Sequence, residues 1–63
     1  MEYMHKVLKF TRTTGCIPAG VRGCVFSVEG DYFWVCFEIP ILGYRNLKVH
    51  RNVIQKHSVM LDY

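Results

Sequence analysis

Three cysteines are the most reactive side chains in this chain of 63 residues. Cys16, Cys24 and Cys36 lie 8 and 12 positions apart, and none belongs to a Cys-x-x-Cys pair of the kind that ligates zinc. Their odd number does not suit the disulfide framework of a small secreted protein. We therefore expect reduced thiols that pack as small buried hydrophobic side chains in a cytoplasmic protein. Cys16 has no base near it in the sequence, so we expect no catalytic thiol.

Histidines and carboxylates are the other candidates for chemistry. His50 and His57 are seven positions apart and His5 is distant, a spacing that does not suit metal ligands on a strand. The five acidic residues do not predict a pair of catalytic carboxylates, and no Gly-rich phosphate loop precedes a helix. These residue types predict a protein that is not an enzyme and that has no metal site and no cofactor.

The whole chain has a net charge of +3, and basic residues gather in its C-terminal third. Arginine and lysine interleaved with an aromatic side chain can contact phosphates and stack on a base. This pattern predicts a nucleic-acid-binding patch as one alternative, and the other reading is a solvated face without a ligand. The candidate phosphate-binding residues are Arg45, Lys48, Arg51 and Lys56.

Glycine and proline interrupt the first two thirds of the chain too often for a long helix. The segments between them are short and rich in β-branched and aromatic residues, which predicts strands. We expect Pro40 to end the third strand, because proline cannot donate to a ladder, and residues 39–45 to form a longer connection. The first four strands are predicted at residues 5–11, 21–28, 32–38 and 46–50.

The C-terminal segment allows two readings. Residues 51–54 can form a tight turn that leads into a fifth strand at 55–61, or one helix can run from residue 51 to about residue 60. We favour the fifth strand.

The second and third strands are expected to form a hairpin around Gly30 and Asp31. A two-residue type II′ turn fits because glycine comes first, and a three-residue turn that includes Glu29 fits equally well. The three-residue turn pairs Val25 with Val35, Cys24 with Cys36, and Phe26 with Trp34. A disulfide between the two cysteines is then conceivable, although we expect the reduced form.

Both faces of this hairpin are apolar in either register, whereas a hairpin with one wet face should alternate apolar and polar residues. One face carries Val25, Phe33, Val35 and Phe37, and the other carries Cys24, Phe26, Trp34 and Cys36. One face fills the core. The other is covered either by a partner or by the chain itself, through Ile39, Ile41, Leu42 or the C-terminal strand. Since Tyr and Trp are enriched at interface hot spots, the predicted partner-binding residues are Phe26, Tyr32, Trp34 and Tyr44.

Five short strands predict an all-β fold closed into a small barrel, which removes exposed sheet edges. The run IPAGVRGCV at residues 17–25 resembles the IPxGxxGxV signature of SH3-like barrels, and residues 30–38 and 47–54 continue the likeness. That family includes a small accessory protein of photosystem I, KOW-type ribosomal domains and small phage proteins. The resemblance implies an SH3-like five-stranded barrel with its core at about residues 5–56, and it implies no particular function. The first loop lacks aromatic residues and Trp34 lies inside the third strand, so polyproline binding is not expected.

The sequence therefore predicts one domain over residues 1–63 that works by binding rather than by catalysis. We expect it to dock on a larger cytosolic protein or to self-associate. Its size is typical of phage or mobile-element proteins that inhibit or modulate a host protein. No uncharged stretch approaches the ~20 residues that a membrane span needs, so we expect no membrane partner and no small-molecule cofactor.

Overall fold

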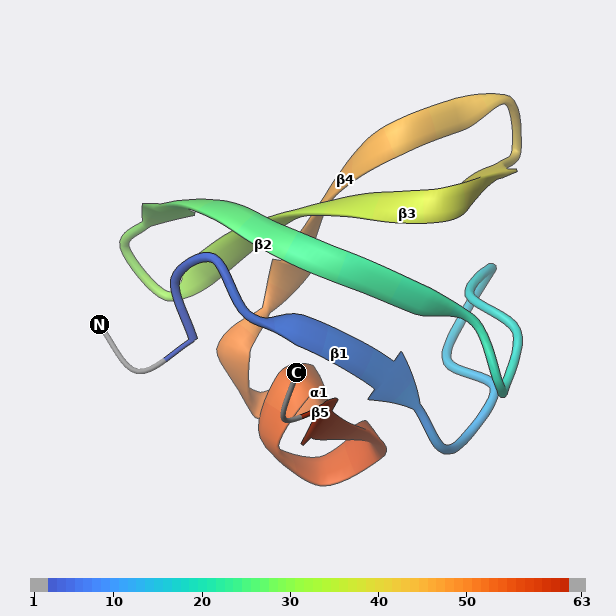
Figure 1. Cartoon of the computed structure of the whole chain (residues 1–63), viewed down its shortest axis with the longest axis horizontal. Helices are drawn as coiled ribbons and strands as arrows, with labels where there is room; N and C mark the ends of the chain where they lie inside the picture. The colour runs from blue at the N-terminus through green and yellow to red at the C-terminus, as the bar shows by residue number, and fades with distance from the viewer. Residues whose placement is uncertain (1–2, 62–63) are drawn as a thin grey trace.

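A computed structural model describes residues 3–61 of the chain as a curled antiparallel sheet with one short helix (Figure 1). The strands follow the order β4-β3-β2-β1-β5, and the sheet curls without closing, since β4 and β5 remain at its two ends. This confirms the predicted all-β, five-stranded, barrel-like fold, but the predicted closure of the sheet is wrong, because the two end strands do not pair with each other. The elements are β1 (Val7–Phe10), β2 (Arg22–Glu29), β3 (Tyr32–Ile41), β4 (Tyr44–His50), α1 (Arg51–His57) and β5 (Ser58–Leu61).

The core lies inside the curl and is built from alternate residues of the strands. Val25 of β2 and Val35 of β3 are fully buried and face each other across the two strands. Gly23 permits this close packing, because a Cβ atom at that position would lie 2.6 Å from Cγ1 of Val35. The predicted inner face of the hairpin is therefore the core face, with Phe33 and Phe37 also buried.

The turn between β2 and β3 has two residues, Gly30 and Asp31, and Glu29 pairs with Tyr32. Gly30 has a φ of +60°, which suits a turn led by glycine. The three-residue turn is thus wrong, although it paired Val25 with Val35 correctly. A β-bulge at Phe26 adds one residue to β2 and restores that register, so that Ser27 rather than Phe26 faces Trp34.

The third strand does not end at Pro40, as the sequence predicted, but continues to Ile41. The register between β3 and β4 is irregular from Cys36 to Ile41, so the missing N–H of Pro40 lies where the ladder is already interrupted. On the other side, the last pair with β2 is formed by Phe37 with Gly23. The end of β3 therefore runs beyond β2, and the β3–β4 hairpin projects from the sheet (Figure 1).

The C-terminal segment combines the two predicted readings. Residues 51–57 form helix α1, and only residues 58–61 form the fifth strand, which pairs with β1. His50 ends β4 and begins the helix, because its Nδ1 accepts a hydrogen bond from the Asn52 N–H. Ile54 is buried in the core, so α1 packs between β4 and β5, the two ends of the open sheet. Within the described residues, no helix is long and apolar enough to span a membrane.

Candidate functional site

The face of β2, β3 and β4 that points away from the core is the outer face, and it is only partly covered. Phe26 and Tyr32 are 42% and 41% exposed, whereas Trp34 and Cys24 are half-buried. The chain does not bury this face with the residues expected to do so, because Ile41 is in the core and Ile39 and Leu42 are exposed. That self-covering alternative is wrong for these three residues.

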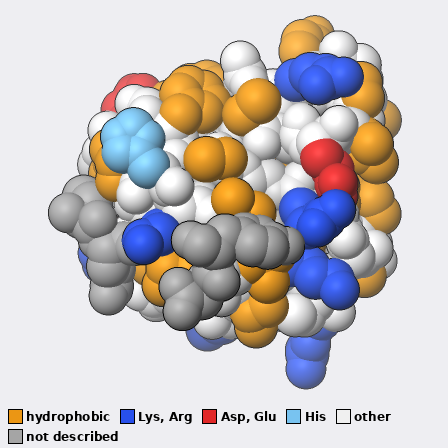
Figure 2. All heavy atoms as spheres, in the orientation of Figure 1, with side chains coloured by type: hydrophobic (Ala, Val, Ile, Leu, Met, Phe, Trp, Pro, Cys, Tyr) orange, Lys and Arg blue, Asp and Glu red, His pale blue; other side chains and the backbone are white. Residues whose placement is uncertain are grey.

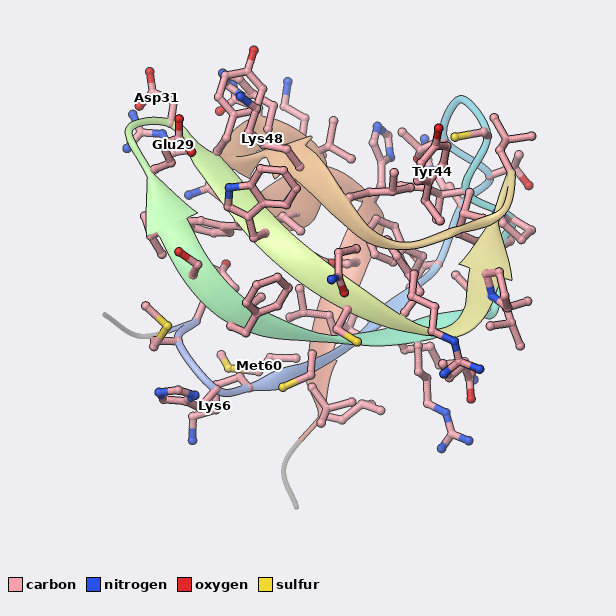
Figure 3. All side chains as sticks on the ribbon, turned by 90° about the horizontal axis from the view of Figure 1, so that it is seen from above. Lys6, Glu29, Asp31, Tyr44, Lys48 and Met60 are labelled. Atoms are coloured by element: carbon pink, nitrogen blue, oxygen red, sulfur yellow. The ribbon has the colours of Figure 1, made fainter. Side chains whose placement is uncertain are left out.

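Two aromatic rings on the outer face share one cation. The Nζ atom of Lys48 lies 5.1 Å from the ring centroid of Tyr32 and 5.9 Å from that of Trp34. The indole N–H of Trp34 donates a hydrogen bond to the Glu29 carboxylate at 3.2 Å, and the Tyr32 ring meets the His50 ring edge-on at 5.0 Å. These contacts restrain the rings of Tyr32 and Trp34. Figure 3 shows Glu29 and Lys48 near the β2–β3 turn.

Tyr44, the fourth predicted partner-binding residue, lies elsewhere. Figure 3 shows it at the far end of β4 from Lys48, next to the β3–β4 turn. There it is 66% exposed, and Leu42 beside it is 78% exposed. We call Ile39, Leu42 and Tyr44 the hairpin tip. The sequence placed Tyr44 with the other aromatics because the projection of this hairpin beyond β2 is a consequence of strand pairing, which the local pattern does not encode.

The four predicted phosphate-binding residues do not form one patch. Lys48 covers the aromatic rings, Arg45 lies further along β4, and Lys56 is exposed on α1. Arg51 is matched by Asp31, with 3.6 Å between Nε and Oδ1 and a backbone hydrogen bond of 2.8 Å from the Arg51 N–H to the Asp31 carbonyl. On the face that Figure 2 shows, basic side chains lie among acidic, hydrophobic and uncharged atoms.

A shallow groove of about 410 Å³ crosses the outer face at the opposite end from the aromatic pair. Glu38 of β3 borders it and accepts a hydrogen bond of 2.9 Å from the backbone N–H of Arg22, whose Nη2 lies 3.4 Å from the same carboxylate. The backbone hydrogen bond, followed by the side-chain one, lowers the pKa of Glu38 below its ordinary value of 4.5. The groove is lined by Val7, Arg22, Gly23, Cys24, Cys36, Phe37, Glu38 and Arg45.

The cysteines are less buried than the sequence suggested. Cys16 and Cys36 are exposed, Cys24 is half-buried, and all three are free thiols. Cys24 and Cys36 are direct cross-strand partners, as predicted, and both line the groove. They point outward because they alternate with Val25 and Val35, which fill the core.

Within residues 3–61, no three or more His, Cys, Asp or Glu side chains gather into a group that could hold a metal ion. The two histidines seven positions apart lie at opposite ends of α1: His50 caps its start and His57 is its last residue.

Comparisons of the chain with protein-family models, with curated proteins and with solved structures find no match.

Proposed function

We propose that this protein is a non-enzymatic binding module that docks on a larger cytosolic protein, or on a second copy of itself, through the outer face of the β2–β3 hairpin. One observation carries the proposal: the hairpin is apolar on both faces, and only its inner face is buried by the chain. Exposed aromatic side chains that are already held in place lose little conformational freedom on binding. Tyr32 is held in this way by Lys48 and His50, and Trp34 by Lys48 and Glu29.

Phe26 is central to this surface. It occupies the β-bulge, which commonly re-aims a side chain, and it is 42% exposed rather than packed in the core. An exposed phenyl ring is the kind of apolar anchor that fills a pocket on a partner. The hairpin tip adds a second apolar area through Tyr44 and Leu42.

The charges around the outer face favour a protein partner over nucleic acid. Glu29 and Asp31 lie beside Lys48 and Arg51 at the β2–β3 turn, so the local charge is mixed (Figure 3). Phosphate binding favours a stripe of one sign, whereas protein interfaces accept both. The SH3-like family and the role as a modulator of a host protein belong to the same proposal and rest on the sequence.

A matched pair of variants tests the proposed surface. Phe26→Ser alters the outer face, and Val59→Ser removes an equally exposed apolar side chain from β5. We expect Phe26→Ser to lower self-association, measured as the mass by light scattering at several concentrations under reducing conditions, and Val59→Ser to leave it unchanged. If wild type is a monomer, the same pair is compared in capture of cytosolic proteins. Equal behaviour of both variants, or unfolding of Phe26→Ser, contradicts the proposal.

A second candidate function is supported by one contact. Lys48 above two aromatic rings could bind a phosphate while a base stacks on Tyr32. Such binding should weaken steeply with salt, because phosphate contacts release counterions. Retardation of a short single-stranded oligonucleotide at low salt, lost in Lys48→Gln, would favour this alternative, and its absence in wild type would remove it.

A further inference from the structure

Two cysteines lie opposite each other in the strand register on the outer face, and the Cys24 thiol lies 3.7 Å from the Val25 carbonyl oxygen of its own strand. Cys24 of β2 and Cys36 of β3 are paired residues of the antiparallel ladder. Directly opposed residues of antiparallel strands have Cα atoms about 4.5–5.5 Å apart, and disulfides span Cα separations of about 4.4–6.8 Å. The two side chains lie on the same side of the sheet, since residues opposite each other share a face. A bond between them therefore requires no rearrangement of the strands.

The backbone hydrogen bonds show which kind of ladder pair the two cysteines form. The Val25 N–H donates to the Lys6 carbonyl, and the Val25 carbonyl accepts from the His5 N–H, so the backbone of Val25 faces the N-terminal segment. Because these directions alternate along a strand, the backbone of Cys24 faces β3, and Cys24 and Cys36 form a hydrogen-bonded pair. Side chains of such pairs stand further apart than those of non-hydrogen-bonded pairs. A disulfide here would be exposed to solvent at Cys36, and exposed disulfides are readily reduced.

The surroundings favour an anionic reagent. Both cysteines line the groove, and Cys36 is exposed to solvent while Cys24 is half-buried. Arg22 and Arg45 line the same groove, and Glu38, its acidic member, is engaged by Arg22. The groove thus presents the Cys36 thiol to solvent, and Arg45 lines the same groove. A disulfide that bears carboxylates fits this arrangement.

We propose that Cys24 and Cys36 form a dithiol site that reacts reversibly with glutathione disulfide or a related anionic low-molecular-weight disulfide. The Cys36 thiolate attacks one sulfur of the reagent, which forms a mixed disulfide and releases one glutathione thiolate. The Cys24 thiolate then attacks the Cys36 sulfur, releases the second glutathione and closes the cross-strand bond. Each thiol loses one proton, the protein loses two electrons, and the reagent is reduced to two glutathione molecules.

Cys16 provides an internal contrast. It is exposed in the loop between β1 and β2, within the turn bridged by Thr14 and Ile17, and it faces neither of the other two cysteines in the strand register. A mixed disulfide on Cys16 has no resolving thiol opposite it. We therefore expect Cys16 to retain one glutathione, whereas the Cys24–Cys36 pair closes and retains none.

The test is intact-mass measurement of the full chain after incubation with glutathione disulfide. In Cys16→Ser, the expected product is a monomer that lacks two hydrogens and carries no adduct, and an excess of reduced glutathione restores the starting mass. In Cys16→Ser/Cys24→Ser, the expected product keeps one glutathione on Cys36. Circular dichroism of each variant before the reaction confirms that it is folded.

Three results would overturn the proposal: no reaction of folded Cys16→Ser, a product with two stable glutathione adducts, or a disulfide-linked dimer. A second measurement isolates the role of Arg45. In Arg45→Gln, the first step with glutathione disulfide should slow severalfold, while the step with neutral 2-hydroxyethyl disulfide keeps its rate. Equal slowing with both reagents would show that Arg45 does not select an anionic one.

Discussion

A two-residue hairpin turn lies at each end of β3, and the two turns differ in backbone conformation and in contacts. At the first, Gly30 takes the positive φ of +60°, and Asp31 contacts Arg51 through both its carboxylate and its carbonyl. At the second, Leu42 has a φ of +51° ahead of Gly43 at +83°, and it is 78% exposed. A positive φ is a backbone outlier for a bulky side chain such as leucine. The first turn follows local preferences and is anchored, and the second goes against them at an exposed tip.

The residues of the first turn stabilise the fold, whereas Leu42 in the second turn is exposed and does not. The residues of the β2–β3 turn are explained by turn geometry and by their contacts with the start of α1. Stability does not explain Leu42, since both its conformation and its exposure are unfavourable. Sites that break a local rule without a stabilising contact are the places where function is sought first. The outer face and the hairpin tip are such places, and the β2–β3 turn is not.

The largest effects are expected from alanine at the two turn glycines. In Gly30→Ala and Gly43→Ala, the new Cβ meets no atom within 4 Å, so the cost comes from the backbone alone. Because alanine must adopt a left-handed conformation at either position, each substitution should lower the free energy of unfolding by about 1–2 kcal/mol. Chemical denaturation measures both. A Gly43→Ala variant as stable as wild type would show that the second turn does not hold its positive φ.

Leu42→Asn should have the opposite effect to the two glycine substitutions and stabilise the protein. Asparagine tolerates the left-handed region, so the substitution relieves strain and removes an exposed apolar side chain. We expect the free energy of unfolding to rise by about 1 kcal/mol. Leu42→Ala is the control, because it shortens the side chain and keeps the backbone strain. Equal stability of the two variants would mean that strain at Leu42 is not the cause.

Removing the ion pair between Asp31 and Arg51, which anchors the first turn, should have a smaller effect. Asp31→Asn removes the charge that faces Arg51, an ion pair exposed on both sides. Such pairs contribute about 0.2–1 kcal/mol and are screened by salt. We expect thermal unfolding at low salt to shift slightly downward in Asp31→Asn and to match wild type at about 1 M salt. A difference that persists at high salt would indicate that the side chain acts through packing instead.

The smallest effect concerns Glu38, towards the hairpin tip. Hydrogen bonds from Arg22 lower the pKa of this exposed carboxyl below 4.5 in the folded protein. Its ionised form therefore stabilises the fold above the ordinary pKa, and this contribution disappears as the pH falls through the lowered pKa. The difference in unfolding temperature between wild type and Glu38→Gln should be present at neutral pH and vanish in acid. A constant difference would assign the effect to something other than ionisation.

Much of the fold could be predicted from local patterns. A hairpin around Gly30 and Asp31 and an apolar inner face with Val25 and Val35 are both present. Cys24 and Cys36 are also opposed as predicted, but through a two-residue turn and a bulge rather than through the three-residue turn from which that pairing was derived. The bulge at Phe26 was missed, because an extra residue in one strand is visible only when its partner is aligned with it. The length of α1 was missed for a related reason: the pairing of residues 58–61 with β1 decides where the helix must end.

Residue types a few positions apart were enough to predict an all-β chain whose central hairpin turns around Gly30 and Asp31 and is apolar on both faces, but they left the length of that turn open. Which apolar residues are left uncovered depends on the three-dimensional arrangement of the strands. Phe26 and Leu42 are exposed while Ile41 and Val25 are buried, although all four are hydrophobic. Burial depends on how far each strand extends past its neighbours and where the sheet curls, and these are properties of long-range pairing.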